Sequence, residues 1–275
     1  MISSMSTVHD VRQVVNHLWT HPANRGHRAD ACRRAVSFQL RGRILGRTTR
    51  VHLGPDSQMW AELHHWASSQ VAYGSPPDWN EMVAWRRLLS PGDLFVDGGA
   101  NVGVYSVWAA ESGADVIAVE PDPESAWRLL RNMALNNYQV ELVCAALSNV
   151  PGPVQMTFGL DVGNHLSLGD HGTEVRGTTL DEVLGDRSAA GVKLDLEGAE
   201  RLAVEGAADA LSEHRIGHLQ LEWNWCSSDL LGETREPLAK LLRGWGYRLY
   251  RPDEAGRLQS IDDDAFGPDV FAAAT

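Results

Sequence analysis

Strand, turn and helix follow one another closely in the stretch Leu94-Phe95-Val96-Asp97-Gly98-Gly99-Ala100-Asn101-Val102-Gly103 and the residues behind it. The apolar run 94–96 predicts a buried strand, which ends at Asp97 and leads into a glycine-rich turn. Val104, Val107 and Trp108 then recur at helical spacing. Glycine lets the backbone approach a ligand closely, and the first turn of a helix offers free N–H groups. This stretch therefore predicts a ligand-binding turn.

Three classes of ligand bind at a turn of this kind, and the spacing of its residues separates them. A P-loop requires lysine and then serine or threonine behind its last glycine, whereas Val104-Tyr105 follows Gly103 here. A dinucleotide turn requires GxGxxG, but Ala100 stands where the second glycine belongs. The pattern that remains is D-x-G-x-x-x-G, from Asp97 to Gly103. It suits S-adenosylmethionine, whose ammonium pairs with a carboxylate and which has no pyrophosphate.

The alternation of strand and helix continues through the rest of the chain. Further strands are predicted at 116–119, 140–144, 191–196 and 217–223, helices at 122–133, 198–211 and 237–245, and a closing pair of strands at 247–250 and 269–272. Alternating strands and helices form a parallel sheet that is covered on both faces, with ligands at the carboxyl ends of the strands. We therefore expect an α/β, doubly wound, mostly parallel seven-stranded sheet.

A different pattern precedes this region. We expect a helix at 11–19, a hairpin formed by 36–41 and 48–53, and helices at 60–68 and 78–89. Residues 1–77 are thus predicted to form an N-terminal extension that acts as a substrate lid, and residues 78–275 the S-adenosylmethionine-binding domain. Tryptophans gathered before the first strand of that domain suit an aromatic wall for an acceptor, or they simply attach the N-terminal helices.

A second carboxylate lies one strand–helix–strand step beyond the turn. Glu120 ends the second predicted strand, where a carboxylate can accept hydrogen bonds from both hydroxyls of a ribose. The alternative is a surface glutamate before a turn. Ala146 and Ser148 belong to a run of small residues after the third strand, and we expect them at the adenine pocket.

The overall charge argues against a nucleic-acid substrate. The net charge is −12, and residues 91–275 carry 13 Lys and Arg against 30 Asp and Glu, whereas phosphate binding requires clustered cations. The three cysteines show no CxxC spacing, and no window of the sequence is apolar enough for a membrane span. We expect a reduced, cytoplasmic protein with no membrane partner, and its sequence is compatible with a homodimer.

Further blocks give the chain a family resemblance. Asp97–Gly103 is followed by Glu120-Pro121, by Thr179-Leu180-Asp181 and by Lys193-Leu194-Asp195-Leu196-Glu197-Gly198-Ala199-Glu200. In this order the blocks resemble those of the FkbM-type methyltransferases, class I enzymes that depend on S-adenosyl-L-methionine. The resemblance covers residues 78–223. It implies a Rossmann-like fold and transfer of a methyl group to a hydroxyl of a small molecule, such as a polyketide, a sugar or another secondary metabolite.

The resemblance also adds candidate residues. Asn101 fits the family's turn, and Glu81 matches a glutamate in the helix before the first strand, although the neighbouring aromatic residue is shifted. The candidate cofactor-binding residues are therefore Glu81, Asp97, Gly99, Asn101, Gly103, Glu120, Ala146 and Ser148.

The fourth strand supplies the candidate catalytic residues. Asp195 falls at its carboxyl end, a position that faces the methyl group and the acceptor in class I methyltransferases. An alcohol becomes a good nucleophile when its proton is removed, and Asp195 can remove it or orient a histidine that does. The alternative is a helix-capping carboxylate. Glu197 is the second candidate. Lys193 is expected to be structural, paired with Asp181 or Glu222.

The connection 152–177 is longer than an ordinary loop, and long loops often cover sites. Of its residues, His165 is our candidate base or acceptor-orienting residue, because a histidine can exchange a proton near neutral pH. A solvent-exposed loop histidine is the alternative. Mg²⁺ is a weaker expectation, with Asp195, Glu222 and Asn224 as its ligands. No metal site is expected at His17 and His21, which lack further ligands at zinc spacing.

Two other functions compete with O-methyl transfer to a small molecule. A nucleic-acid or protein N-methyltransferase is disfavoured by the acidic charge and because Asp195-Leu196-Glu197-Gly198 stands where an Asn/Asp-Pro-Pro-Tyr/Phe signature is expected. A non-catalytic S-adenosylmethionine-binding scaffold is disfavoured because Asp97, Glu120 and Asp195 are all present.

Overall fold

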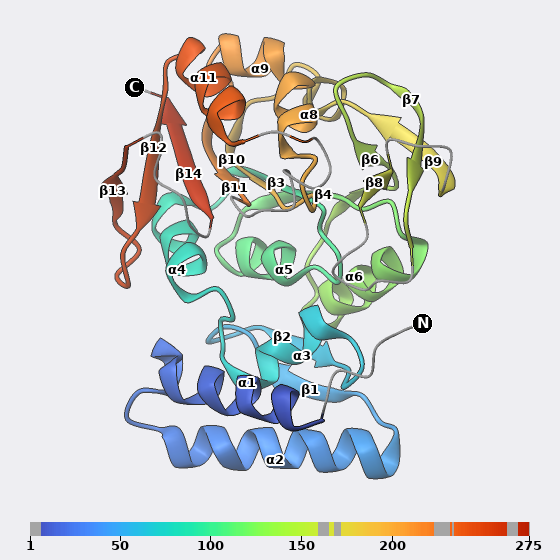
Figure 1. Ribbon diagram of the computed structural model, residues 1–275, viewed down its shortest axis with the longest axis vertical. Coiled ribbons are helices and arrows are strands. Elements are labelled where there is room, and N and C mark those ends of the chain that lie inside the picture. Colours follow the sequence, from blue (N-terminus) through green and yellow to red (C-terminus); the bar gives the residue numbers. More distant parts are fainter. Residues whose placement is uncertain are drawn as a thin grey trace. The chain divides into compact units, whose positions relative to one another are not determined.

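The computed structural model describes residues 7–158, 165–167, 172–222, 232, 234–262 and 269–274, with side chains from residue 14 onward. The chain divides into two compact units, Met1–Trp79 and Asn80–Thr275 (Figure 1). The lid role expected for residues 1–77 stays a prediction.

The C-terminal unit is built on a twisted sheet that has eight strands in the described residues, in the order β13-β12-β14-β11-β10-β3-β4-β5. Five of its strands are parallel: β3 (Leu94–Gly98), β4 (Asp115–Val119), β5 (Glu141–Val143), β10 (Ala189–Leu194) and β11 (Ile216–Leu221). The antiparallel strands are β12 (Tyr247–Pro252), β13 (Leu258–Ser260) and β14 (Val270–Ala274). The predicted α/β class is confirmed. The described sheet has one strand more than the predicted seven, because it includes the short edge strand β13.

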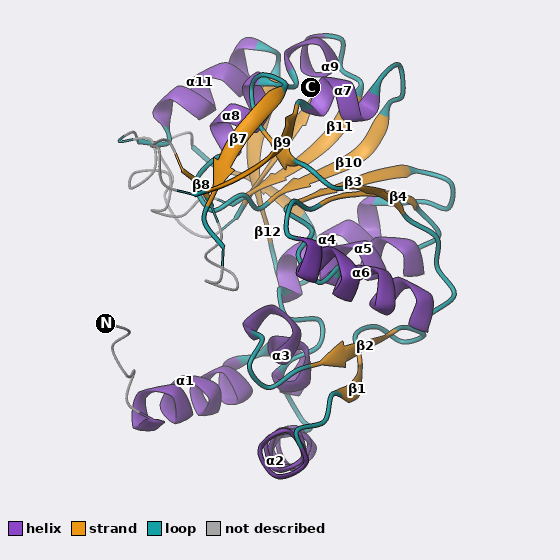
Figure 2. Ribbon diagram, turned by 90° about the vertical axis from the view of Figure 1, so that its right-hand side faces the viewer, coloured by secondary structure: helices purple, strands orange, loops and turns teal. Residues whose placement is uncertain are grey.

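Helices cover both faces of this sheet (Figure 2). One face carries α4 (Trp79–Leu88), α5 (Val104–Glu111) and α6 (Pro123–Leu135), and the other α7 (Leu180–Leu184), α8 (Glu200–Glu205), α9 (Ala208–Ser212) and α11 (Glu236–Gly244). Helix α6 begins as its sequence predicts, because the Asp122 side chain accepts hydrogen bonds from the N–H groups of Glu124 and Ser125.

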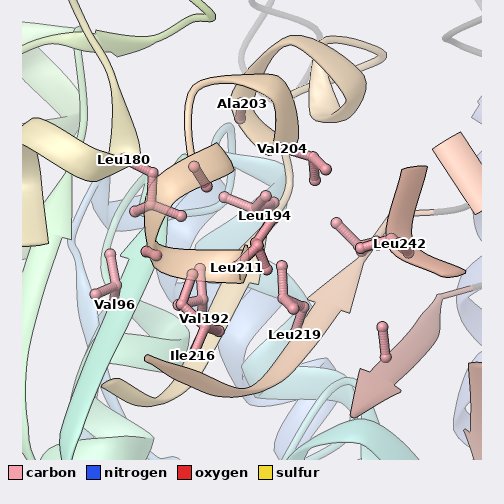
Figure 3. Close-up of a cluster of buried hydrophobic side chains, with 14 of the residues drawn as sticks. Val96, Leu180, Val192, Leu194, Ala203, Val204, Leu211, Ile216, Leu219 and Leu242 are labelled. Atoms are coloured by element: carbon pink, nitrogen blue, oxygen red, sulfur yellow. The ribbon is translucent and has the colours of Figure 1, made fainter. Parts of the chain in front are cut away.

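The core of the C-terminal unit lies between the strands and the second group of helices (Figure 3). Val192, Leu194, Leu219 and Leu221 are fully buried, because alternate residues of β10 and β11 share the face that these helices cover. Each such side chain contributes about 1.5–3 kcal/mol when it leaves water. This packing fixes the strand ends on which the site is built.

Two predictions within the C-terminal unit need correction. The connection 152–177, predicted as a loop, contains strands in its described part: β7 (Gly152–Met156), β8 (Leu166–Ser167) and β9 (Thr173–Thr178). Together with β6 (Ala146–Leu147), which precedes the connection, they form a second sheet. The single helix predicted at 198–211 is divided into α8 and α9. The division falls at Gly206, where a Cβ would collide with the carbonyl oxygen of Ser148.

The N-terminal unit contains α1 (Thr7–Thr20), a short 3₁₀ helix (Pro22–Asn24), α2 (Arg28–Leu45), the hairpin of β1 (Thr49–His52) and β2 (Gln58–Ala61), and α3 (Trp66–Tyr73). The predicted pairing of 36–41 with 48–53 is wrong, because 36–41 lies inside α2. That helix buries Ala31, Ala35 and Phe38, which recur at helical spacing. The helix predicted at 60–68 is likewise wrong in its first part, since Trp60 belongs to β2.

Candidate active site

The parallel strands β3, β4, β10 and β11 end side by side at one edge of the sheet, and this brings the candidate functional residues together. Gly98 pairs with Val119 on one side and with Leu194 on the other, and Leu194 pairs in turn with Leu221. Glu120, Asp195 and Glu222 each follow one of these strand ends directly. Residues that are far apart in sequence thus meet at one edge of the sheet, as is typical of ligand sites in open α/β folds.

The glycine turn is held against the fourth parallel strand. Gly99 has a φ of +72°, and a Cβ there would collide with the carbonyl oxygen of Asp195. The Asp195 N–H donates a 3.1 Å hydrogen bond to the Gly98 carbonyl oxygen. Gly103 has a φ of +83°, and its Cβ would lie 2.8 Å from Leu129 Cγ. The glycines therefore let the turn pass close to both neighbours.

Asp97 is a buried carboxylate behind this turn, with only 1% of its surface exposed. Its Oδ2 accepts a 2.6 Å hydrogen bond from Ser106 Oγ, and its Oδ1 has no hydrogen-bond partner among the described residues. Burial raises the pKa of Asp97, and the nearby Lys193 ammonium opposes that rise. A second donor to Asp97, such as the predicted cofactor ammonium, would satisfy the remaining oxygen.

Glu120 lies at the end of β4 and is 7% exposed. Its two carboxylate oxygens accept 2.8 Å hydrogen bonds from the backbone N–H groups of Asn101 and Asp122. Burial raises the pKa of Glu120 to about 7, and these two hydrogen bonds act in the opposite direction. Each oxygen retains a lone pair for a further donor. Asn101, with a φ of +48°, thus belongs to the same cluster as Glu120.

Lys193 lies near the carboxyl end of β10, beside the end of β3. The prediction that it pairs with Asp181 or Glu222 is wrong. Its Nζ lies 2.9 Å from Asp195 Oδ2 and 4.6 Å from the centre of the Tyr105 ring, and β10 pairs it with Asp97. Burial alone would lower the pKa of Lys193, but the carboxylates of Asp195 and Asp97 outweigh it and raise that pKa. Asp181 instead accepts hydrogen bonds from backbone N–H groups at the start of α9.

Asp195, Glu197 and Glu222 form an acidic cluster, with one oxygen from each within 4.8 Å of the others. The first helical residue behind them is Glu200, with Ala199 as its N-cap, so the alternative that Asp195 caps this helix is wrong. Burial, and next the charges of Asp195 and Glu197, raise the pKa of Glu222 to about 10. Three carboxylates this close can share a proton or bind a divalent cation.

The other predicted catalytic residue lies on a different element. His165 lies just before β8 in the second sheet, where its Nδ1 is 3.2 Å from Thr157 Oγ1. Its neighbour Leu166 packs in a cluster with Ala199, which lies two residues beyond Glu197 in the chain. The candidate Mg²⁺ ligand Asn224 lies outside the described residues. A catalytic role for His165 stays a prediction.

The remaining cofactor candidates have different surroundings. Ala146 is buried in β6 and packs in the cluster that contains Ala199. Ser148 is also buried, and its N–H donates a 2.9 Å hydrogen bond to the Thr178 carbonyl oxygen. Glu81 is half-buried in the first turn of α4, on an element that precedes the glycine turn. Cofactor contacts from these three residues stay predictions.

Sequence reasoning missed the link from Lys193 to Asp195, whereas it had already grouped Glu222 with Asp195 as candidate metal ligands. Side chains two residues apart in a strand share a face, and that spacing already relates Lys193 to Asp195. The pairing of Leu194 with Leu221 brings Asp195 and Glu222, the residues that follow them, to the same edge of the sheet.

The sheet order, the glycine turn and the carboxylate at the second strand end define a class I S-adenosylmethionine-dependent methyltransferase. A family model described as the methyltransferase FkbM domain matches residues 97–249, which is more than half of the 275 residues. The chain belongs to the FkbM methyltransferase family. None of the curated proteins matches the chain.

Solved structures with a similar fold include a 16S rRNA N2 G1207 methyltransferase of T. thermophilus in complex with AdoMet and guanosine, with 17% identity and a TM-score of 0.47. That match covers 83% of this chain, which spans only 50% of the length of the T. thermophilus protein. Another is the magnesium protoporphyrin IX methyltransferase of Synechocystis PCC 6803 with bound SAM, with 16% identity, a TM-score of 0.40, and coverage of 70% and 76% of the two chains.

The described part of the chain has no helix that combines the length and apolar character of a membrane span.

Proposed function

We propose that this methyltransferase transfers a methyl group to a hydroxyl of a small secondary metabolite or sugar. The observation that carries the proposal is the acidic cluster of Asp195, Glu197 and Glu222 beside the glycine turn. Carboxylates at the acceptor side can take the proton of an alcohol. The same negative charges repel the phosphates of a nucleic acid, which favours an uncharged acceptor.

The residues present suit S-adenosylmethionine. The orphaned Oδ1 of Asp97 suits its ammonium, and Gly99 leaves room that a Cβ would fill. Glu120 would accept hydrogen bonds from the ribose hydroxyls, while Asn101 holds that carboxylate through its backbone N–H. Ala146 and Ser148 remain the candidates for the adenine pocket.

When bound, the cofactor supplies an electrophilic methyl group on its sulfonium. Asp195 directs a carboxylate toward the acceptor, since its side chain remains 42% exposed while Lys193 holds Oδ2. In the proposed mechanism, Asp195 accepts the proton of the acceptor hydroxyl, with His165 as the alternative base. The methyl group would pass to that oxygen as its bond to sulfur breaks, and S-adenosylhomocysteine would be the leaving group. Holding the reacting atoms in line supplies much of the rate. Glu197 adds a second carboxylate to the same cluster.

Cofactor affinity is expected to depend on pH through Glu120. Its pKa of about 7 in the free protein means that the carboxylate is largely protonated at pH 6 and largely ionised at pH 8. Ribose hydroxyls donate to the ionised form, so affinity falls as the pH is lowered. We expect S-adenosylhomocysteine to bind about tenfold more weakly at pH 6 than at pH 8, in proportion to the competent fraction. Calorimetry on Glu120→Gln should show this pH dependence lost, and a dependence of unchanged size would assign it to another group.

The acceptor class is tested with S-adenosylmethionine carrying a labelled methyl group. The panel contains hydroxylated macrolactones, sugars and phenols, with matched amines and a structured RNA as competing classes. We expect label on an oxygen of a small molecule, located by mass spectrometry. Exclusive labelling of an amine or of the RNA would contradict O-methyl transfer to a small metabolite.

A further inference from the structure

Glu200 is a fully buried carboxylate just behind the acidic cluster, with 0% of its surface exposed. Its Oε1 accepts hydrogen bonds from the backbone N–H of Leu196, at 3.0 Å, and of Gly198, at 3.2 Å. One oxygen atom therefore closes the turn on both sides of Glu197. The backbone of Glu197 has a φ of +52° and that of Gly198 a φ of +105°. Such a conformation is costly for a glutamate and persists only where its surroundings hold it.

The second oxygen of Glu200 meets a cation from another part of the fold. Arg235, the N-cap residue of α11, lies 3.4 Å away through Nη1 and is 5% exposed. Burial raises the pKa of Glu200, and Arg235 and the two backbone N–H groups oppose that rise. A buried charge of this kind is tolerated when it is paired and hydrogen-bonded. The pair thus links the turn after β10 to the start of α11.

We propose that Glu200 is a positioning residue whose carboxylate, neutralised by Arg235, sets the conformation of the turn that carries Asp195 and Glu197. Glu200 Oε1 accepts hydrogen bonds from the backbone of the turn, and the effect reaches the acceptor through the direction of the two catalytic candidates. The consequence for turnover rests on the proposed function, whereas the conformation of the turn can be measured without any acceptor.

Two double variants separate the hydrogen bonds from the buried charge. Glu200→Gln with Arg235→Met keeps an oxygen that can accept the N–H groups of Leu196 and Gly198, and it leaves no buried charge. Glu200→Ala with Arg235→Met removes that oxygen and also leaves no buried charge. The matched control is Glu205→Gln in the same helix, which breaks an ion pair with Arg201 away from the turn.

The first readout is hydrogen exchange of the Leu196 and Gly198 amides, measured by NMR. We expect exchange in the glutamine double variant to stay within about threefold of the unsubstituted protein, and to accelerate about 30-fold or more in the alanine double variant. Glu205→Gln should leave both amides unchanged. Equal protection in the two double variants would overturn the proposal, whether or not an acceptor is known.

The second readout is turnover with the best acceptor of the panel, together with calorimetry using S-adenosylhomocysteine. The alanine double variant should lose about tenfold or more in kcat relative to the glutamine double variant, while both bind S-adenosylhomocysteine within about threefold of one another. If Glu200 only stabilised the fold, its replacement would not lower kcat while leaving the affinity for S-adenosylhomocysteine unchanged. Equal kcat in the two double variants would also overturn the proposal. Failure of the unsubstituted protein to methylate any acceptor would count against the proposed function alone, because the hydrogen-exchange measurement does not require an acceptor.

Discussion

Replacing Asp195 with asparagine is expected to lower kcat about 10²–10⁴-fold, the range that a general base contributes. Asparagine keeps the shape of the side chain but cannot take a proton from an alcohol. The affinity for S-adenosylhomocysteine should change far less, because none of the predicted cofactor-binding residues lies on β10 or in the turn after it. Steady-state turnover with the panel acceptor, with calorimetry beside it, measures both quantities. Near-normal turnover would remove Asp195 from the chemistry.

Treatment of the unsubstituted protein with EDTA distinguishes a base from a metal ligand at Asp195. Asp195 also belongs to the acidic cluster that can hold a divalent cation. Turnover of the unsubstituted protein that EDTA abolishes and Mg²⁺ restores would assign Asp195 to a metal site, and His165 would become the first candidate for the base. Turnover that is insensitive to EDTA supports direct proton transfer to Asp195.

Replacing Gly99 with alanine is expected to destabilise the C-terminal unit and to abolish cofactor binding. The added Cβ would collide with the Asp195 carbonyl oxygen, and the φ of +72° is itself unfavourable for alanine. Overpacking costs about 1–3 kcal/mol and the left-handed backbone about 1–2 kcal/mol more. We expect a loss of about 3 kcal/mol in the free energy of unfolding, measured by urea denaturation.

Gly92→Ala, in the same unit, is the matched control for this effect. Gly92 also has a positive φ, of +85°, but a Cβ added there would meet no neighbouring atom within 4 Å. Its substitution should cost only the backbone term, about 1–2 kcal/mol, and leave cofactor affinity unchanged. Equal losses in the free energy of unfolding of the two variants would show that the collision with the Asp195 carbonyl oxygen does not contribute to the loss.

The sequence predicts the C-terminal unit well where local pattern determines the structure. Apolar runs, the glycine turn and the Asp122-Pro123 helix start are short-range signals, and they located β3, β4 and α6 correctly. The N-terminal hairpin was mispredicted because valine and leucine at 36–41 resemble a strand. Helix α2 is instead favoured by the packing of Ala31, Ala35 and Phe38, which depends on distant residues.

In the candidate site, too, the local sequence pattern predicts some features, while others depend on residues that are distant in the chain. Spacing along the chain pointed to Glu120 and Asp195, since each directly follows an apolar strand. The sequence also grouped Glu222 with Asp195, at the ends of the fourth and fifth predicted strands, and the pairing of Leu221 with Leu194 brings the two residues together. The hydrogen bonds of Glu200 around Glu197 follow from a backbone conformation that no sequence pattern encodes.

The central claim is that S-adenosylmethionine binds at the ends of β3 and β4, and calorimetric titration with S-adenosylhomocysteine at pH 8 tests it most directly. We expect one site per chain in the unsubstituted protein. Glu120→Ala should bind about 10²-fold or more weakly, since two charge-assisted hydrogen bonds are each worth about 1.5–3 kcal/mol. Absence of binding by the unsubstituted protein, or the same affinity in Glu120→Ala, would contradict the account.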